Sequence, residues 1–286
     1  MAKPSKLPQL TSLTLQYVPF KWSSPIFSDL RYLCLRTIPQ YSIAIDRILY
    51  IINANTRLET LVLYIAAANT AVLPLSQTTL EHVTTFSIGG HFLLTTLLDC
   101  LSLPAVENLM IDIEAREPVE EILSQLLVRS NHPPVSRLSL SYMLHGSSST
   151  LYYHTGSGVT SWNFLSDMDD LHTLQVGGAP FEPLLAILGT PEDDGLDQWF
   201  CPKLVALSMK GCRPTHSDCV GKLVQMVEAR NPDLASGGVP MIAAGVTPTR
   251  LRHLELHDCT TLGLDVMQWL LKRIPEVVCT EPPFDR

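Results

Sequence analysis

The 286-residue sequence predicts an α/β fold in which short parallel strands alternate with helices or loops along a repeating array. Two observations carry this prediction: a short apolar motif returns along nearly the whole chain, and the segments between its copies have helical periodicity. The motif reads L-x-x-L-x-L. It is clear in "CPKLVALSMKGC" (201–212), where Leu204, Leu207 and Met209 are the apolar positions.

The motif occurs nine times, which chance does not explain in a chain of this length. Its central apolar residues are Leu13, Leu33, Leu61, Phe86, Leu109, Leu138, Leu174, Leu207 and Leu254. Successive copies lie 20, 28, 25, 23 and 29 residues apart, and then 36, 33 and 47. Repeats with this pattern of leucines have roughly 20–29 residues per unit. The array therefore begins regularly and contains insertions toward its end.

Four segments between the copies are predicted helices. In "SIAIDRILYIINAN" (42–55), Ile45, Ile48, Leu49 and Ile52 lie on one face at helical spacing. The others are 118–131, which begins with a proline and two acids, and 216–232 and 264–275, which each end at a proline. We expect the last helix to cover the final repeat, and Pro275 with the "EPPFDR" tail to end the array.

Two stretches depart from this plan and are predicted loop insertions. Residues 145–158 are rich in serine and glycine, and residues 231–249 are rich in proline and glycine. The second insertion accounts for the longest step between copies. We therefore expect residues 1–286 to form a single repeat domain of about nine irregular repeats.

At "CPKLVALSMKGC", "LRHLELHDC", "LPQLTSLTL" and "FSDLRYLCL" the chain resembles leucine-rich-repeat proteins of the F-box class, especially the fungal F-box group. The resemblance runs from Leu7 to about Ile274. It implies an irregular leucine-rich-repeat solenoid, or horseshoe, with a parallel β-sheet on the concave face and helices and loops on the convex face.

The same resemblance implies a function. In that family the repeats capture a protein substrate for a ubiquitin ligase, while a separate F-box helix bundle binds a Skp1-type adaptor. Only six residues precede the first repeat, so we expect no F-box in this chain, which is then a fragment or a variant without that module. Adaptor binding is expected only if an F-box is supplied upstream. The alternative is a free-standing repeat scaffold or inhibitor with no link to ubiquitin.

Composition excludes several other functions. The net charge is -8 and no basic tract occurs, which argues against nucleic-acid binding. The N-terminus lacks the apolar region of a signal peptide, and the apolar stretches are too short for a membrane span. The seven cysteines have no paired spacing and fit reduced thiols, so we expect a cytoplasmic or nuclear protein.

Two groups of residues resemble metal sites, and for both a simpler interpretation is favoured. Cys212, His216 and Cys219 lack the paired spacing of structural zinc, and buried core thiols are expected instead. His253, Glu255 and His257 share one side of a strand, and a solvated strand face is the commoner arrangement. No phosphate loop, calcium loop or cysteine–histidine catalytic signature occurs. We therefore expect no enzyme activity, metal or cofactor.

Binding of a protein partner is then the favoured function. In each strand the residues between and beside the apolar positions are expected to point to the concave surface, Cys34 among them. Aromatic and arginine side chains are frequent anchors of protein interfaces. The candidate contact residues are Tyr32, Arg36, Tyr64 and Arg137 as anchors, with Asp112, Lys210, His253 and Glu255 as polar specificity contacts.

Two further expectations concern the core and the first strand. Cys212 and Cys259 hold the same position in successive repeats, so both should be buried, reduced and close neighbours. The first strand begins within a few residues of Met1 with no helix to shield it. An uncovered strand edge pairs readily with another chain. We therefore expect self-association through residues 7–20.

Overall fold

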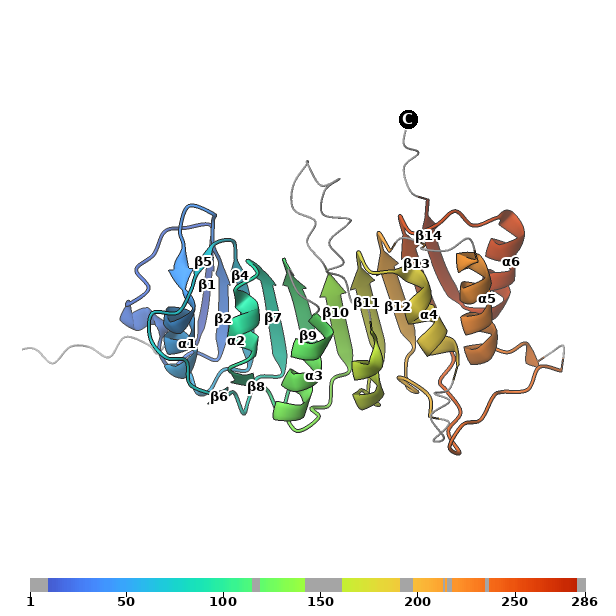
Figure 1. Ribbon diagram of the computed structural model, residues 1–286, viewed down its shortest axis with the longest axis horizontal. Coiled ribbons are helices and arrows are strands. Elements are labelled where there is room, and N and C mark those ends of the chain that lie inside the picture. Colours follow the sequence, from blue (N-terminus) through green and yellow to red (C-terminus); the bar gives the residue numbers. More distant parts are fainter. Residues whose placement is uncertain are drawn as a thin grey trace, which may run out of the picture. The chain divides into compact units, whose positions relative to one another are not determined.

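The computed structural model describes residues 10–114, 119–141, 161–190, 198–212, 214, 218–234 and 237–281. The chain forms two compact units: Met1–Glu114 with Gln125–Pro133 (unit 1), and Ala115–Ser124 with Pro134–Arg286 (unit 2). Each unit has parallel strands with helices on one face of its sheet (Figure 1). The predicted α/β class is confirmed.

The sheet of unit 1 contains five parallel strands. In order they are β1 (Ser12–Gln16), β2 (Tyr32–Arg36), β4 (Thr60–Ile65), β7 (Thr85–Gly90) and β9 (Asn108–Ile113). Neighbouring strands pair in register, so equivalent motif positions form rows across the sheet. The central row is Leu13, Leu33, Leu61, Phe86 and Leu109.

Short helices and small sheets complete unit 1. The helices are α1 (Ile45–Asn53), α2 (Leu94–Leu98), the C-terminal part of α3 (Val119–Arg129) and the 3-10 turn η1 (Pro25–Phe27). Two-stranded parallel sheets pair β3 (Ile43–Ala44) with β5 (Ala68–Asn69), and β6 (Thr78–Thr79) with β8 (Leu101–Ser102). The face predicted to be apolar in α1, namely Ile45, Ile48, Leu49 and Ile52, is buried as expected.

Unit 2 repeats the plan with longer helices. Its strands are β10 (Arg137–Ser141), β11 (Thr173–Gly177), β12 (Ala206–Lys210), β13 (His253–His257) and β14 (Glu276–Thr280), all parallel and in register. Its helices are α4 (Phe181–Gly189), α5 (Cys219–Arg230), α6 (Leu264–Arg273) and the 3-10 helix η3 (Asn163–Asp167). The helices predicted over 118–131, 216–232 and 264–275 are therefore confirmed as α3, α5 and α6, and α2 and α4 were missed.

The apolar motif positions form the core. All nine predicted copies are parallel strands, and from the second copy onward all three apolar side chains of each copy are at most 3% exposed. Full burial of one such side chain stabilises a fold by roughly 1.5–3 kcal/mol. The first copy differs, since Leu10 is 47% exposed and Leu13 and Leu15 are only partly covered. Strand β1 is thus the weakest-packed strand of its sheet.

The expected end of the array is wrong. Pro275 does not end it, because β14 follows at once as a tenth strand and pairs with β13. The sequence carries the signal: Ile274, Val277 and Cys279 have the spacing of the motif, and Val277 and Cys279 have smaller side chains than leucine. Ile274 is fully buried, like its equivalents in the second to ninth copies.

A buried asparagine just after a helix is hydrogen-bonded to the backbone at the start of a strand motif in each unit. Asn55 accepts a hydrogen bond from the backbone N–H of Leu30 (2.8 Å) and donates to the carbonyls of Phe27 and Ile51 (2.7 Å each). Asn231 accepts from the N–H of Leu251 (2.9 Å) and donates to the carbonyls of Leu251 (2.8 Å) and Arg273 (3.1 Å). Leu30 and Leu251 are equivalent motif positions, but Asn55 bonds the copy before its helix and Asn231 bonds the copy after its helix.

Arg230 adds a buried cation to unit 2. Its guanidinium donates to the carbonyls of Leu188 (2.7 Å), Phe200 (2.6 Å) and Cys201 (3.3 Å), and lies over the ring of Trp199. Burial lowers the pKa of Arg230 to about 10. The Cys201 carbonyl also accepts from the backbone N–H of Leu204. Arg230 therefore links the end of α4 to the loop before β12 through buried hydrogen bonds.

Cys212 and Cys259 are buried free thiols, as predicted. Cys212 donates to the carbonyl of Val176 (3.6 Å) and Cys259 to that of Met209 (3.3 Å). The hydrogen bond between the two thiols, together with burial, raises the pKa of Cys212. Cys212 is therefore a neutral, packed part of the core.

The two predicted insertions have different outcomes. Residues 145–158 lie outside the described part of the chain. The described residues of 231–249 form an irregular loop with one isolated bridge between Ala243 and Val246, in agreement with the prediction. Across the residues that the structure describes, no helix has both the length and the apolar character needed to span a bilayer.

Candidate functional site

The candidate site is the face of each sheet that the helices leave uncovered, which we call the open face (Figure 1). Core positions alternate along each strand with open-face positions, as the burial patterns of β4, β10 and β13 show. The eight predicted contact residues all occupy open-face positions. They fall into two groups: Tyr32, Arg36, Tyr64 and Asp112 in unit 1, and Arg137, Lys210, His253 and Glu255 in unit 2.

The open face of unit 1 is organised around a stacked pair. The guanidinium of Arg36 lies 4.3 Å from the centre of the Tyr64 ring in the next strand. On its other side the Tyr64 ring lies against Gly89, where a Cβ atom would come within 2.5 Å of the ring. Arg36 and Tyr64 are thus brought together, and the ring is fixed between a cation and a glycine.

One prediction for this face is wrong. Cys34 was expected to point out to solvent, but it is only 3% exposed. In-register pairing places Thr14 and Val62 on either side of it, and these neighbours cover the small thiol. Ser87, 1% exposed between Val62 and Met110, is covered in the same way. The exposure of a small side chain on the open face therefore depends on its neighbours in the adjacent strands.

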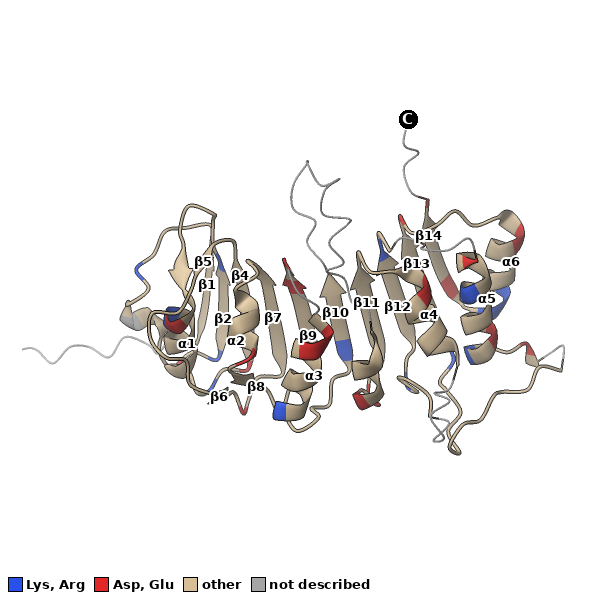
Figure 2. Ribbon diagram, viewed as in Figure 1, with Lys and Arg blue, Asp and Glu red and all other residues tan. Residues whose placement is uncertain are grey.

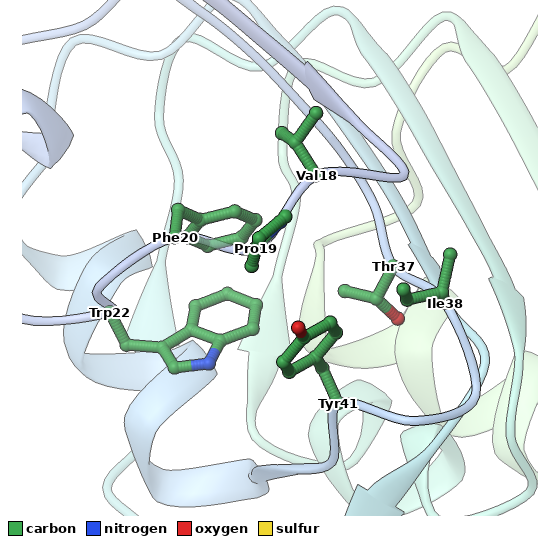
Figure 3. A pocket seen from close by; sticks show the side chains of 7 residues that line it. All are labelled: Val18, Pro19, Phe20, Trp22, Thr37, Ile38 and Tyr41. Carbon is green, nitrogen blue, oxygen red and sulfur yellow. The ribbon is translucent and has the colours of Figure 1, made fainter.

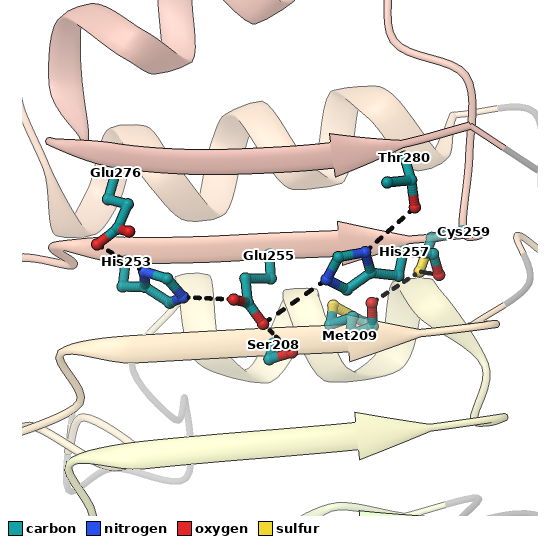
Figure 4. Close-up of polar contacts among 8 residues, drawn as sticks. All are labelled: Ser208, Met209, His253, Glu255, His257, Cys259, Glu276 and Thr280. Atoms are coloured by element: carbon teal, nitrogen blue, oxygen red, sulfur yellow. Dashed lines mark hydrogen bonds and ion pairs between the residues drawn. The ribbon is translucent and has the colours of Figure 1, made fainter.

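The open face of unit 2 carries a chain of charged and polar groups (Figure 4). His253 contacts Glu255 through Nε2 (2.9 Å) and Glu276 of β14 through Nδ1 (3.0 Å). The second oxygen of Glu255 accepts a hydrogen bond from the Ser208 hydroxyl (2.8 Å) and lies 3.8 Å from Nε2 of His257. Of the side chains joined by these contacts, all except Glu276 are at least partly covered.

These contacts shift the ionisation of two groups. The hydrogen bond to Glu255, reinforced by Glu276, raises the pKa of His253 above its ordinary value. The Ser208 hydroxyl and His253 lower the pKa of Glu255. The protonated imidazole and the ionised carboxylate therefore stabilise each other.

Two predicted cations on this face stand apart from the cluster. Arg137 in β10 and Lys210 in β12 are both exposed, and among the described residues neither has an ion-pair partner within 4 Å. Charged side chains of both signs occur on α5 and α6, β13 and β14 carry acids, and much of β10–β12 is uncharged (Figure 2). Lys210 borders a hollow of about 310 Å³ that crosses β10 to β13.

Sequence reasoning did not select several members of the unit 2 face as contact residues. Ser208, His257 and Thr280 complete the polar chain, with Nδ1 of His257 lying 3.1 Å from the Thr280 hydroxyl. Ser208 and His257 were expected on this surface but were not chosen as contacts. Glu276 and Thr280 were missed because β14 was not recognised as a tenth copy. The in-register pairing of Ser208 with Glu255 depends on strand neighbours that are 47 residues apart.

A second hollow lies near the N-terminal edge and is too small for a ligand. Phe20 and Trp22 pack edge to face at 4.2 Å between ring centres, and both approach Phe27. Phe20, Trp22, Tyr41 and Ile38 are among the residues that surround a space of about 20 Å³ (Figure 3). A space of this size holds about one water molecule. These aromatic residues form a small satellite core.

Neither group considered as a metal site forms one in the described structure. His216 lies outside the described residues, and Cys219 lies at the start of α5, where its thiol contacts the Thr260 hydroxyl. Glu255 stands between His253 and His257 and contacts both directly. Within the described residues, no group of histidine, cysteine, aspartate or glutamate side chains has an arrangement that could hold a metal ion.

Comparison with known proteins gives no assignment. No protein-family model matches the chain. No curated protein matches it significantly either.

Proposed function

We propose that this chain is a protein-binding module whose open faces bind the partner. The observation that carries the proposal is the rigid, in-register rows of side chains, which the core does not need. Adjacent strands present these side chains at a spacing of about 4.8 Å, which suits contact with a protein surface. Arg36 and Tyr64 are held in one geometry before binding. Anchors fixed in this way lose little conformational entropy on association.

The proposal includes the finer fold that the sequence predicts. An irregular leucine-rich-repeat solenoid, with the open faces on its concave side, accounts for ten motif copies in short parallel strands. It also accounts for the helices and loops that cover the opposite face of each sheet (Figure 1).

The narrower role is substrate recognition for an F-box-type ubiquitin ligase in the cytoplasm or nucleus. Its support is the resemblance of "CPKLVALSMKGC" and "LRHLELHDC" to the cysteine-containing repeats of that class. The burial of Cys212 and Cys259 agrees with the structural role that such repeats give to their closing cysteines. Binding of a Skp1-type adaptor would need an F-box supplied by another segment or chain.

Photo-crosslinking tests the protein-binding proposal. Benzoylphenylalanine replaces Thr60 and Gln175 on the two open faces, and Tyr50 of α1 and Gln225 of α5 as exposed controls on helices. In extracts of the cells that produce the protein, we expect protein adducts from an open-face position and few from the helix positions. Adducts of equal yield at all four positions, or only from the helices, would contradict the proposal.

The ligase role has its own test. If the crosslinked partner is a substrate, removing this protein from the cells should lengthen the partner's half-life several-fold. An unchanged half-life would leave protein binding intact and would reject the ubiquitin link.

A further inference from the structure

The hollow on the open face of unit 2 exists because small side chains line it. Ser139, Ser141, Gly177 and Ser208 come from three neighbouring strands and leave the floor low. Gly177 is the key position, since its row would otherwise carry a side chain between Ser141 and Lys210. A Cβ atom added there would meet only ordinary contacts, the nearest at 3.4 Å from the Cβ of Ser141. The space is therefore available to a ligand.

The uncompensated charge at this hollow is positive. Glu255 reaches the hollow, but its carboxylate is already bonded to Ser208 and His253 and lies near His257. Lys210 also borders the hollow, is exposed, and has no ion-pair partner among the described residues. His257, the in-register neighbour of Lys210 in β13, is already in contact with Glu255 and Thr280. An anionic group bound to Lys210 alone would gain the Lys210 charge without displacing an internal ion pair.

We propose that this hollow binds an extended acidic segment of the protein partner, with an aspartate or glutamate carboxylate at Lys210. The inference rests on the proposed protein-binding function and specifies what one of its faces selects. The hollow crosses four strands, a distance of about 14 Å, which an extended peptide covers with about four residues. The hydroxyl group of Ser139 and the amide of Gln175 offer polar contacts along that path.

Selection from a library of random 12-residue peptides displayed on phage, with the full chain as bait, tests this inference. We expect selected peptides to share an aspartate or glutamate at one position. Replacing that acid with its amide should weaken binding roughly tenfold, the usual scale for one lost charged contact. Binding should also weaken as salt is added, because added ions screen the contact.

Variants of the chain locate the contact. Lys210→Met should weaken binding by a similar factor and Lys210→Arg should largely retain it. Gly177→Leu should abolish binding by filling the hollow. Lys222→Met on α5 removes the same charge from the same unit, away from the open face, and should change nothing. Circular dichroism and thermal melting check that each variant is folded. If Gly177→Leu does not fold, Lys210→Met still tests the contact.

The outcomes separate the two proposals. Peptides that bind an open face but lack an acid, or that are unaffected by Lys210→Met, would overturn the acidic-segment inference and keep the protein-binding function. If no selected peptide is sensitive to changes on either open face, both proposals fail.

Discussion

Gly89 in unit 1 and Gly177 in unit 2 occupy the same position in their motif copies, directly after the last apolar residue of the strand motif. Their surroundings differ. The ring of Tyr64 covers Gly89, and the carbonyl of Asp112 leaves no room on the other side. No neighbouring side chain closes the space over Gly177, which opens into the hollow beside Lys210. One scaffold therefore supports a closed surface in one unit and an open one in the other.

The two open faces also differ in the kind of contact that joins their side chains. In unit 1 the contact between Arg36 and Tyr64 involves a permanent cation and a neutral ring. In unit 2 the corresponding contacts join His253, Glu255 and Glu276, whose charges change with pH. The backbone and core are equivalent, so the difference comes from a few open-face side chains. Such a difference can be altered without disturbing the fold.

The largest expected effect is on the shared interior. Asn55→Ala and Asn231→Ala should each lower the free energy of unfolding by about 3 kcal/mol, because each leaves several buried backbone groups unpaired. Urea denaturation of both variants measures the effect. Similar losses would support equivalent interiors. If one of the two variants lost less than about 1 kcal/mol of unfolding free energy, the two asparagines would not stabilise their units equally.

The two glycines should respond differently to the same change. Gly89→Ala should destabilise unit 1 by about 2 kcal/mol, since the new methyl group forces Tyr64 and the backbone of Asp112 apart. Gly177→Ala should change stability by less than about 0.5 kcal/mol. Paired denaturation curves decide this. Equal effects at both positions would contradict the contrast between a closed and an open surface.

A smaller effect is expected from the stacked pair in unit 1. A double-mutant cycle with Arg36→Met and Tyr64→Leu should give a coupling free energy of about 0.5–1 kcal/mol, as for other exposed cation–π contacts. A coupling close to zero would mean that the two side chains do not stabilise each other in this geometry.

The sequence predicted the interior much better than the open faces. Apolar side chains at fixed spacing predict strands because each copy must bury the same three positions, and all nine predicted copies are strands. The tenth was missed because valine and cysteine replace leucine at Val277 and Cys279. The burial of Cys34 and the open space at Gly177 could not be predicted from one strand alone. They depend on the length of side chains in neighbouring strands, which lie tens of residues away.

The smallest expected effect is the pH dependence of the unit 2 cluster. His253 has a pKa raised above 6.5, so its contribution to stability is complete below pH 6.5 and is lost as the pH rises through the folded-state value. Glu255 has a pKa lowered below 4.5, so its contribution is complete above pH 4.5 and is lost on further acidification. The coupling between them should therefore be greatest between pH 4.5 and 6.5.

A double-mutant cycle with His253→Gln and Glu255→Gln measures this coupling, which should be about 0.5 kcal/mol because solvent screens partly exposed pairs. Glu276→Gln removes the second carboxylate and should reduce the coupling of His253 to its surroundings without abolishing the contact with Glu255. The Arg36–Tyr64 cycle, measured at the same pH values, serves as the control. If the His253–Glu255 coupling were as large at pH 8.5 as at pH 5.5, charge would not hold this face together. The two open faces would then differ in shape alone.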